Sequence, residues 1–200
     1  MISTFTAFFD ANVFFGARLR SIIMSLAQTN AFRARWSEDI HREWMKAVIG
    51  RRADITLQSL EPTRRQMDAA VLDCLVTGYE GIIESVELPD PNDRHVLAAA
   101  IVAKSSAIVT FNLKHFPEKA LQPYGIHTVH PDEFILDIDG LTNEALFRAV
   151  DADLKHYSKP PLTLDQYLDD LRKSGIPKTA DHVKDLSVLL DRPDGDTVTS

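Results

Sequence analysis

The chain has 200 residues, 44% of them hydrophobic, which is enough for one domain of typical size with an appendage and a core without disulfides. A single cysteine, no run of 18 apolar residues and a first segment unlike a signal peptide predict a cytoplasmic protein without a membrane span. The formal net charge of −7 argues against a protein held on duplex DNA by bulk electrostatics.

The first part of the chain alternates between strand-like apolar runs and segments with helical spacing. In chain order, the sequence predicts a strand over residues 5–9, a helix over 19–26, a strand over 31–36 and helices over 37–49 and 62–76. Ser37 is the expected N-cap of the helix over 37–49, with Glu38 and Asp39 in its first turn. Pro62 is the expected first residue of the helix that follows.

The same rhythm continues up to about residue 130. In chain order, the sequence predicts a strand over residues 82–88, a helix opened by 90–93 and reaching 103, and strands over 107–111 and 126–129. Strands separated by helix-length segments indicate an α/β fold with a mostly parallel sheet and helices on its faces. Residues 1–139 are therefore expected to form one domain.

Beyond residue 140 the sequence becomes acidic and helical. The predicted helices cover residues 143–156, 164–173 and 180–190, with breaks at Pro160-Pro161 and near Gly175. We expect residues 140–190 to form a helical C-terminal extension and residues 191–200 to be a disordered tail.

Polar side chains follow three of the predicted strands. Asp10 ends the first strand, Asp90 and Asp93 follow the strand at 82–88, and Asn112 comes two residues after Thr110 at the end of the next. Ligand sites of parallel sheets form at the carboxyl ends of strands, where grouped carboxylates need a proton or a cation. A set of oxygen ligands favours Mg²⁺ or Mn²⁺ over zinc.

Each of these residues also has a plainer interpretation. Asp10 alone could be a turn residue, and Asp90 is a good N-cap for the helix that follows. Glu43 lies at the border of the apolar face of the helix over 37–49, where a carboxylate must be paired, protonated or metal-bound. Pairing with a neighbouring arginine or lysine is the alternative to a metal.

Several common catalytic motifs are missing from the sequence. The histidines, among them His95 and His115, lack the spacing of a zinc motif. There is no glycine-rich phosphate loop, no Gly-x-Ser-x-Gly elbow and no dinucleotide fingerprint. These absences argue against NTPases, serine hydrolases and NAD enzymes.

Four segments, in this order, resemble the PIN domain family and are most similar to its VapC-type branch, the toxins of bacterial type II toxin–antitoxin systems. They are Asp-Ala-Asn-Val (10–13), Ser-Glu-Asp-Ile-His-Arg-Glu-Trp (37–44), Leu-Pro-Asp-Pro-Asn-Asp-Arg-His-Val-Leu-Ala-Ala-Ala (88–100) and Ile-Val-Thr-Phe-Asn-Leu-Lys-His-Phe-Pro (108–117). The resemblance covers about residues 3–135, and the stretch 88–117 is its most specific part.

The resemblance implies a three-layer α/β/α fold and a Mg²⁺- or Mn²⁺-dependent ribonuclease. It assigns metal-binding and catalytic roles to Asp10, Glu43 and Asp93. Many members carry a fourth aspartate where this chain has Asn112, with Thr110 supplying the hydroxyl. The amide of Asn112 adds no negative charge, so the resemblance does not establish whether a second metal ion binds. Asp90 could partly replace the missing charge as a further metal ligand.

The resemblance also implies partners. These are an RNA substrate, a cognate antitoxin protein and a second copy of the chain in a homodimer. Residues 1–65 carry a net charge of +4, against −4 in 66–130 and −7 in 131–200, so the RNA backbone is expected on the first third. Its arginines include Arg18, Arg20, Arg33, Arg35, Arg51 and Arg52. The alternative is a catalytically inactive PIN-fold module that binds a protein or RNA, because Asn112 replaces an acid and the last third is acidic.

Overall fold

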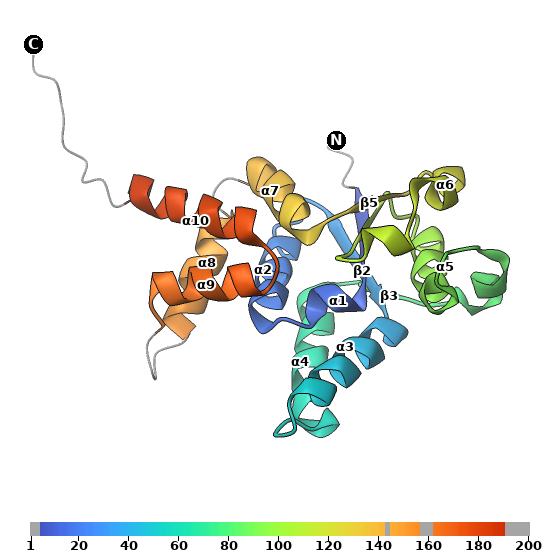
Figure 1. Ribbon diagram of the computed structural model, residues 1–200, viewed down its shortest axis with the longest axis horizontal. Helices are drawn as coiled ribbons and strands as arrows, with labels where there is room; N and C mark the ends of the chain where they lie inside the picture. The colour runs from blue at the N-terminus through green and yellow to red at the C-terminus, as the bar shows by residue number, and fades with distance from the viewer. Residues whose placement is uncertain (1–4, 143–144, 157–161, 191–200) are drawn as a thin grey trace, which may run out of the picture.

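The computed structural model describes residues 5–142, 145–156 and 162–190, and its centre is a five-stranded parallel sheet (Figure 1). The strand order is β3-β2-β1-β4-β5, and every neighbouring pair is parallel. The strands are β1 (Thr6–Phe9), β2 (Arg33–Ser37), β3 (Leu75–Val76), β4 (Ala107–Val109) and β5 (His127–Val129). The first strand is central, so the residue that follows it lies in the middle of one edge of the sheet.

Helices flank this sheet, as the α/β prediction requires. Those of the first part are α1 (Ala11–Phe14), α2 (Ala17–Ala27), α3 (Glu38–Arg51), α4 (Leu57–Ala70), α5 (Arg94–Val102) and α6 (Glu118–Leu121). In Figure 1, α5 lies to one side of the strands and α1 and α2 to the other. The five residues Val96–Ala100 of α5 are all buried, and this helix packs against β1, β2 and β4. The predicted three-layer arrangement is confirmed.

Four of the predicted strands are present with nearly the expected bounds, namely those at 5–9, 31–36, 107–111 and 126–129. The predicted N-cap of α3 is also present, since the Ser37 hydroxyl accepts a hydrogen bond from the Ile40 amide at 3.4 Å. That helix continues past Gly50 to Arg51.

Two local predictions are wrong. The strand over 82–88 is a 3₁₀ helix (Glu80–Ser85) followed by irregular chain, and it packs against α5 instead of joining the sheet. The helix expected to start at Pro62 starts at Leu57, because Thr56 and Ser59 form a reciprocal capping box there. It ends at Ala70, and Leu75–Val76 pair with Trp36 and Ser37 as the edge strand β3.

The C-terminal part consists of α7 (Pro131–Thr142), α8 (Ala145–His156), α9 (Leu164–Lys173) and α10 (Pro177–Leu190). The helical character expected of the extension is therefore present, although α7 already begins at residue 131 and the expected boundary at 139 falls inside it. Pro160-Pro161 and the tail 191–200 lie outside the described residues. None of the described helices has the length and apolarity that crossing a bilayer requires.

Candidate active site

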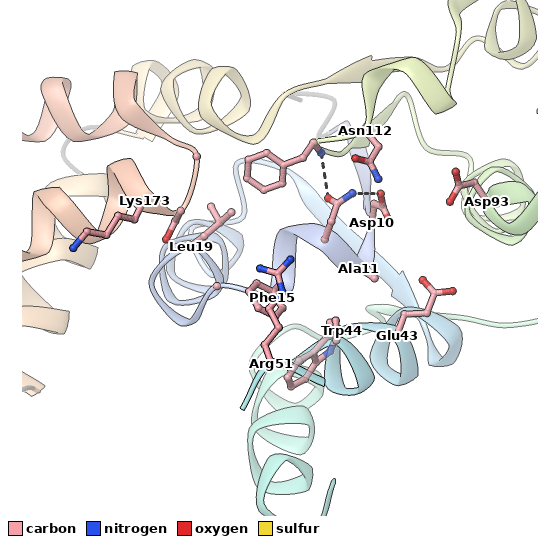
Figure 2. Close-up of a pocket in the computed structure, with 16 residues that line it drawn as sticks. Asp10, Ala11, Phe15, Leu19, Glu43, Trp44, Arg51, Asp93, Asn112 and Lys173 are labelled. Carbon is pink, nitrogen blue, oxygen red and sulfur yellow. Dashed lines mark hydrogen bonds between the residues drawn. The ribbon is translucent and has the colours of Figure 1, made fainter. Parts of the chain in front are cut away.

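A cleft of about 590 Å³ opens where β1 and β4 end (Figure 2). Asp10, Glu43, Asp93 and Asn112 all line it, although they come from the ends of β1 and β4, from α3 and from the turn before α5. The geometry thus brings together four of the residues that the sequence singled out. The same cleft is also lined by residues of α1, α2 and the turn between α9 and α10.

Asp10 is a buried acid of the cleft, with 6% of its surface exposed. Its position is fixed by the sheet, because the Asp10 amide donates to the Val109 carbonyl of β4 at 3.1 Å. The Thr110 hydroxyl and the Asn12 side-chain amide both donate to Asp10 Oδ2, each at 2.6 Å. Both bonds go to the same oxygen of the carboxylate.

Burial raises the pKa of Asp10 to about 6, from an ordinary value near 3.8. The Thr110 hydroxyl opposes this shift, while the negative charges of Asp93 and Glu43 add to it. The three acids therefore lie close enough to repel one another, and Asp10 holds its proton up to nearly neutral pH.

Histidines contact the other two acids. His95 Nε2 lies 2.9 Å from Glu43 Oε1, and His115 Nδ1 lies 2.6 Å from Asp93 Oδ2. His95 Nδ1 is buried without a hydrogen-bond partner among the described residues. Burial raises the pKa of Asp93, and the contact with His115 lowers it in part.

The other two predicted residues, Thr110 and Asp90, do not line the cleft. Thr110 is fully buried, and its hydroxyl oxygen also accepts from the Asn12 side chain and the Asn112 amide, each at 3.0 Å. It therefore orients Asp10 from behind the cleft wall. Asp90 does not line the cleft, and its carboxylate accepts from the amide of Asn92 at 2.9 Å as an N-cap.

The residues of the cleft fit a hard divalent cation. Each of Asp10, Glu43 and Asp93 uses one carboxylate oxygen to contact Thr110, Asn12 or a histidine, and its other oxygen takes no part in these contacts. No lysine or arginine of the described residues forms an ion pair with any of the three. Three carboxylates without a lysine or arginine partner in the described part of the chain are the ligand type that Mg²⁺ or Mn²⁺ prefers. Among the described residues, the group of three acidic or histidine side chains whose ligand atoms all lie within 4.8 Å of one another is Asp90, Asp93 and His115, and neither Asp10 nor Glu43 belongs to it.

The arginines of residues 1–65 do not all lie at the cleft. Arg51 lines the cleft, with its guanidinium 4.6 Å from the centre of the Phe15 ring. Arg18 lies near Asp170, and Arg52 pairs with Asp54. Arg33 begins β2, so it lies at the opposite end of the sheet from the cleft. The basic character of this third therefore reaches the cleft mainly through Arg51.

Sequence reasoning did not assign Asn12 or His95 to this site, and for His115 it preferred an exposed loop over a position near a phosphate. Asn12 joins the two strand ends, because its side chain donates to Asp10 and accepts from the Phe111 amide at 3.2 Å. His95 lies two residues after Asp93, and its spacing could have suggested a role beside that acid. Zinc-motif spacing was the wrong criterion, because these rings contact carboxylates.

Comparisons with known proteins agree with this geometry. Residues 6–114 match the family described as PIN domain, and residues 131–185 match the family described as VapC50 C-terminal domain. The chain is also 44% identical over 94 residues to a Mycobacterium tuberculosis (strain ATCC 25618 / H37Rv) protein named "Putative ribonuclease VapC50".

The matched region is 47% of this chain and 55% of that relative, so the chain spans about half of the relative's length. No solved structure matches the chain.

Proposed function

This chain belongs to the PIN domain family, with its matches in the VapC-type branch, and we propose that it is an endoribonuclease that acts as a toxin. In this proposal a Mg²⁺ or Mn²⁺ ion binds among Asp10, Glu43 and Asp93, and the chain hydrolyses phosphodiester bonds of RNA. The relative's name, which calls it a ribonuclease, supports this activity.

One observation carries the proposal. Three acids from separate segments of the chain line one cleft, and no lysine or arginine of the described residues pairs with them. Such an arrangement costs free energy in the absence of a cation, and functional sites are where such costs are found.

A bound divalent ion would offset the charge of the scissile phosphate and lower the pKa of the attacking water. The side chains of the chain then have separate tasks. Thr110 and Asn12 hold Asp10 Oδ2, and these two bonds fix the orientation of the whole carboxylate. Asp10 could also accept a proton from the attacking water if the ion leaves one of its oxygens free.

The orientation of the other acids comes from the histidines. His95 keeps the Glu43 carboxylate at the cleft wall, and His115 does the same for Asp93. Asn112, from the end of β4, offers a carbonyl oxygen that can orient a ligand or a water, but it adds no charge. We therefore propose one tightly held ion, with Asp90 as a further ligand only if a second ion binds beside Asp93 and His115.

Arg51 supports the choice of an anionic substrate. Its guanidinium lies over the Phe15 ring, and Arg51 lines the cleft. Once a Mg²⁺ or Mn²⁺ ion offsets the charge of the acids, the positive charge of Arg51 would favour a phosphate there. We further propose a cytoplasmic location, an antitoxin protein as the cognate partner and a homodimer, all of which rest on the family.

The experiment is a cleavage assay with total cellular RNA as the probe, in which the ends of the products are sequenced. With Mg²⁺ we expect cuts at discrete sites, and with EDTA none. Asp10→Asn and Asp93→Asn should each lower the cleavage rate by about a hundredfold or more. Asp137→Asn, at an exposed position outside the cleft, is the matched control. Full activity in EDTA, or an Asp10→Asn variant as active as the control, would overturn the proposal.

The toxin role is tested in cells. Expression of the chain should arrest growth, and Asp10→Ala or co-expression of the neighbouring gene's product should restore it. If the chain cleaves RNA but its expression does not slow growth, the toxin role is contradicted and the nuclease activity is not.

The alternative is a module that keeps the fold without the chemistry, and Asn112 is the residue that favours it. Titration calorimetry with Mn²⁺ separates the two functions. The nuclease requires a site that Asp10→Asn weakens, whereas the module requires none.

A further inference from the structure

The turn between α9 and α10 forms one wall of the proposed nuclease cleft. Lys173, Ser174 and Gly175 line the same cavity as Asp10 and Glu43, although they belong to the C-terminal extension. In Figure 2 this turn and Lys173 lie on the side of the cleft opposite Glu43 and Asp93. A substrate that fills the cleft would therefore lie beside residues of the extension.

Close packing fixes this turn against the loops that follow β1 and β4. Gly175 has a φ of +83°, and a Cβ at this position would lie 2.9 Å from Phe111 Cε1. The neighbouring Ser174 lies against Gly16, where a Cβ would meet the Ser174 hydroxyl at 3.5 Å. Phe111 and Gly16 also line the cleft, so the wall is continuous from the sheet to the extension.

The start of α10 holds the turn from its other side. The buried carboxylate of Asp132, in α7, accepts from the amides of Lys178 and Thr179 at 2.9 and 2.7 Å and from the Thr179 hydroxyl at 2.7 Å. This cap places the first turn of α10 and leaves little freedom for the residues before it.

The charge of Lys173 is not needed for this packing. Its ammonium lies 3.9 Å from Asp170 Oδ1, a loose contact, and the side chain is 77% exposed. Asp170 already has a second cation, because Arg18 Nε lies 3.6 Å from its other oxygen and the Arg18 side chain is only 15% exposed. One carboxylate therefore lies beside two cations, and the exposed Lys173 side chain, which extends away from the acids in Figure 2, would have to rotate to contact a ligand in the cleft.

We propose that Lys173 binds the phosphate backbone of RNA and, with Arg51, positions it across the cleft. The inference rests on the proposed nuclease function and extends it to the C-terminal extension. Lys173 and Arg51 line the same cavity from α9 and α3, and a polyanion beside a metal-loaded acidic pocket would contact both. Lys173 is a substrate-positioning residue in this proposal, because it lines the side of the cleft opposite Glu43 and Asp93.

The test measures the steady-state rate of cleavage of a fluorescent RNA hairpin with a randomised loop, at several salt concentrations. Lys173→Glu should raise KM by about five- to tenfold with little change in kcat, and it should flatten the dependence of log KM on log salt by about one unit. Lys173→Arg should restore most of the affinity. Mn²⁺ affinity by calorimetry should remain that of the wild type.

Lys155→Glu is the matched control. Lys155 lies in α8 of the same extension, is 75% exposed and pairs with an aspartate of its own helix, yet it does not line the cleft. Equal KM values and salt slopes for Lys173→Glu and Lys155→Glu, in a wild-type chain that cleaves the hairpin, would overturn this inference alone. A wild-type chain without metal-dependent cleavage would overturn both the inference and the proposed function.

Discussion

Asp10 combines a buried position with a charge that the proposed function needs. Its pKa is raised from about 3.8 to about 6, chiefly by burial, so the folded chain holds this proton more tightly than the unfolded chain does. The resulting stability is present below pH 4 and is lost as the pH rises through 6. In the metal-free chain at neutral pH, ionised Asp10 therefore lowers the free energy of unfolding by up to about 3 kcal/mol.

This reasoning predicts that Asp10→Asn stabilises the metal-free chain. The gain should be larger at pH 7.5 than at pH 5 by about 1 to 1.5 kcal/mol, or roughly 3–5 °C in Tm, because asparagine does not ionise. Thermal unfolding in EDTA at the two pH values measures it. Asp137→Asn, which replaces an exposed acid, should show no such dependence on pH. A gain from Asp10→Asn that is the same at both pH values would contradict the raised pKa.

At the scale of elements, the turn between α9 and α10 depends on one glycine. Gly175 and Gly125 both have positive φ, +83° and +67°, but of the two only Gly175 faces a close neighbour, since a Cβ there would lie 2.9 Å from the Phe111 ring. Both alanine variants should lose about 1 kcal/mol to backbone strain, and Gly175→Ala should lose about 1–3 kcal/mol more to the clash. Urea unfolding of the two variants measures the difference. Equal losses would show that the Phe111 ring moves aside freely.

The elements that can be predicted from the sequence are those whose signal is local. The residues of β1 and β4 are almost all buried, so these strands stand out as continuous apolar runs. The place of Asp10 is predictable because it directly follows an apolar strand, whereas Asp93 follows a 3₁₀ helix and not the strand that the sequence suggested. Ser37 is predictable because capping needs only its own neighbours.

The elements that the sequence does not reveal depend on distant partners. Ile82 and Ile83 are apolar enough for a strand, but they pack on α5, and a short apolar run does not distinguish these outcomes. β3 is a strand of two residues that exists only through its pairing with β2. Likewise, the contact of His95 with Glu43 joins α5 to α3 and has no trace in either segment alone.

At the scale of the whole molecule, the extension and the sheet share one core. Phe134 of α7 packs edge-on against Phe9 and Phe32, with ring centres 5.4 and 4.9 Å apart. Beyond α7, α8 packs on α2, and the Ser21 hydroxyl donates to Asp153 at 2.5 Å across this contact. The acidic extension thus covers part of the positively charged first third, and a division at residue 139 crosses a continuous hydrophobic core.

A chain shortened to residue 142 tests this shared core. It keeps α7 but loses α8, α9 and α10, and with α8 the buried residues Leu146 and Val150 of the helix that covers α2. We expect a lower Tm and strong binding of the dye ANS, because the apolar face of α2 becomes exposed to water. A chain ending at residue 190 keeps every described helix and should melt like the full chain. If the chain ending at 142 melts at the same temperature as the full chain and binds no more dye, the extension is an independent appendage and the nuclease fold is complete without it.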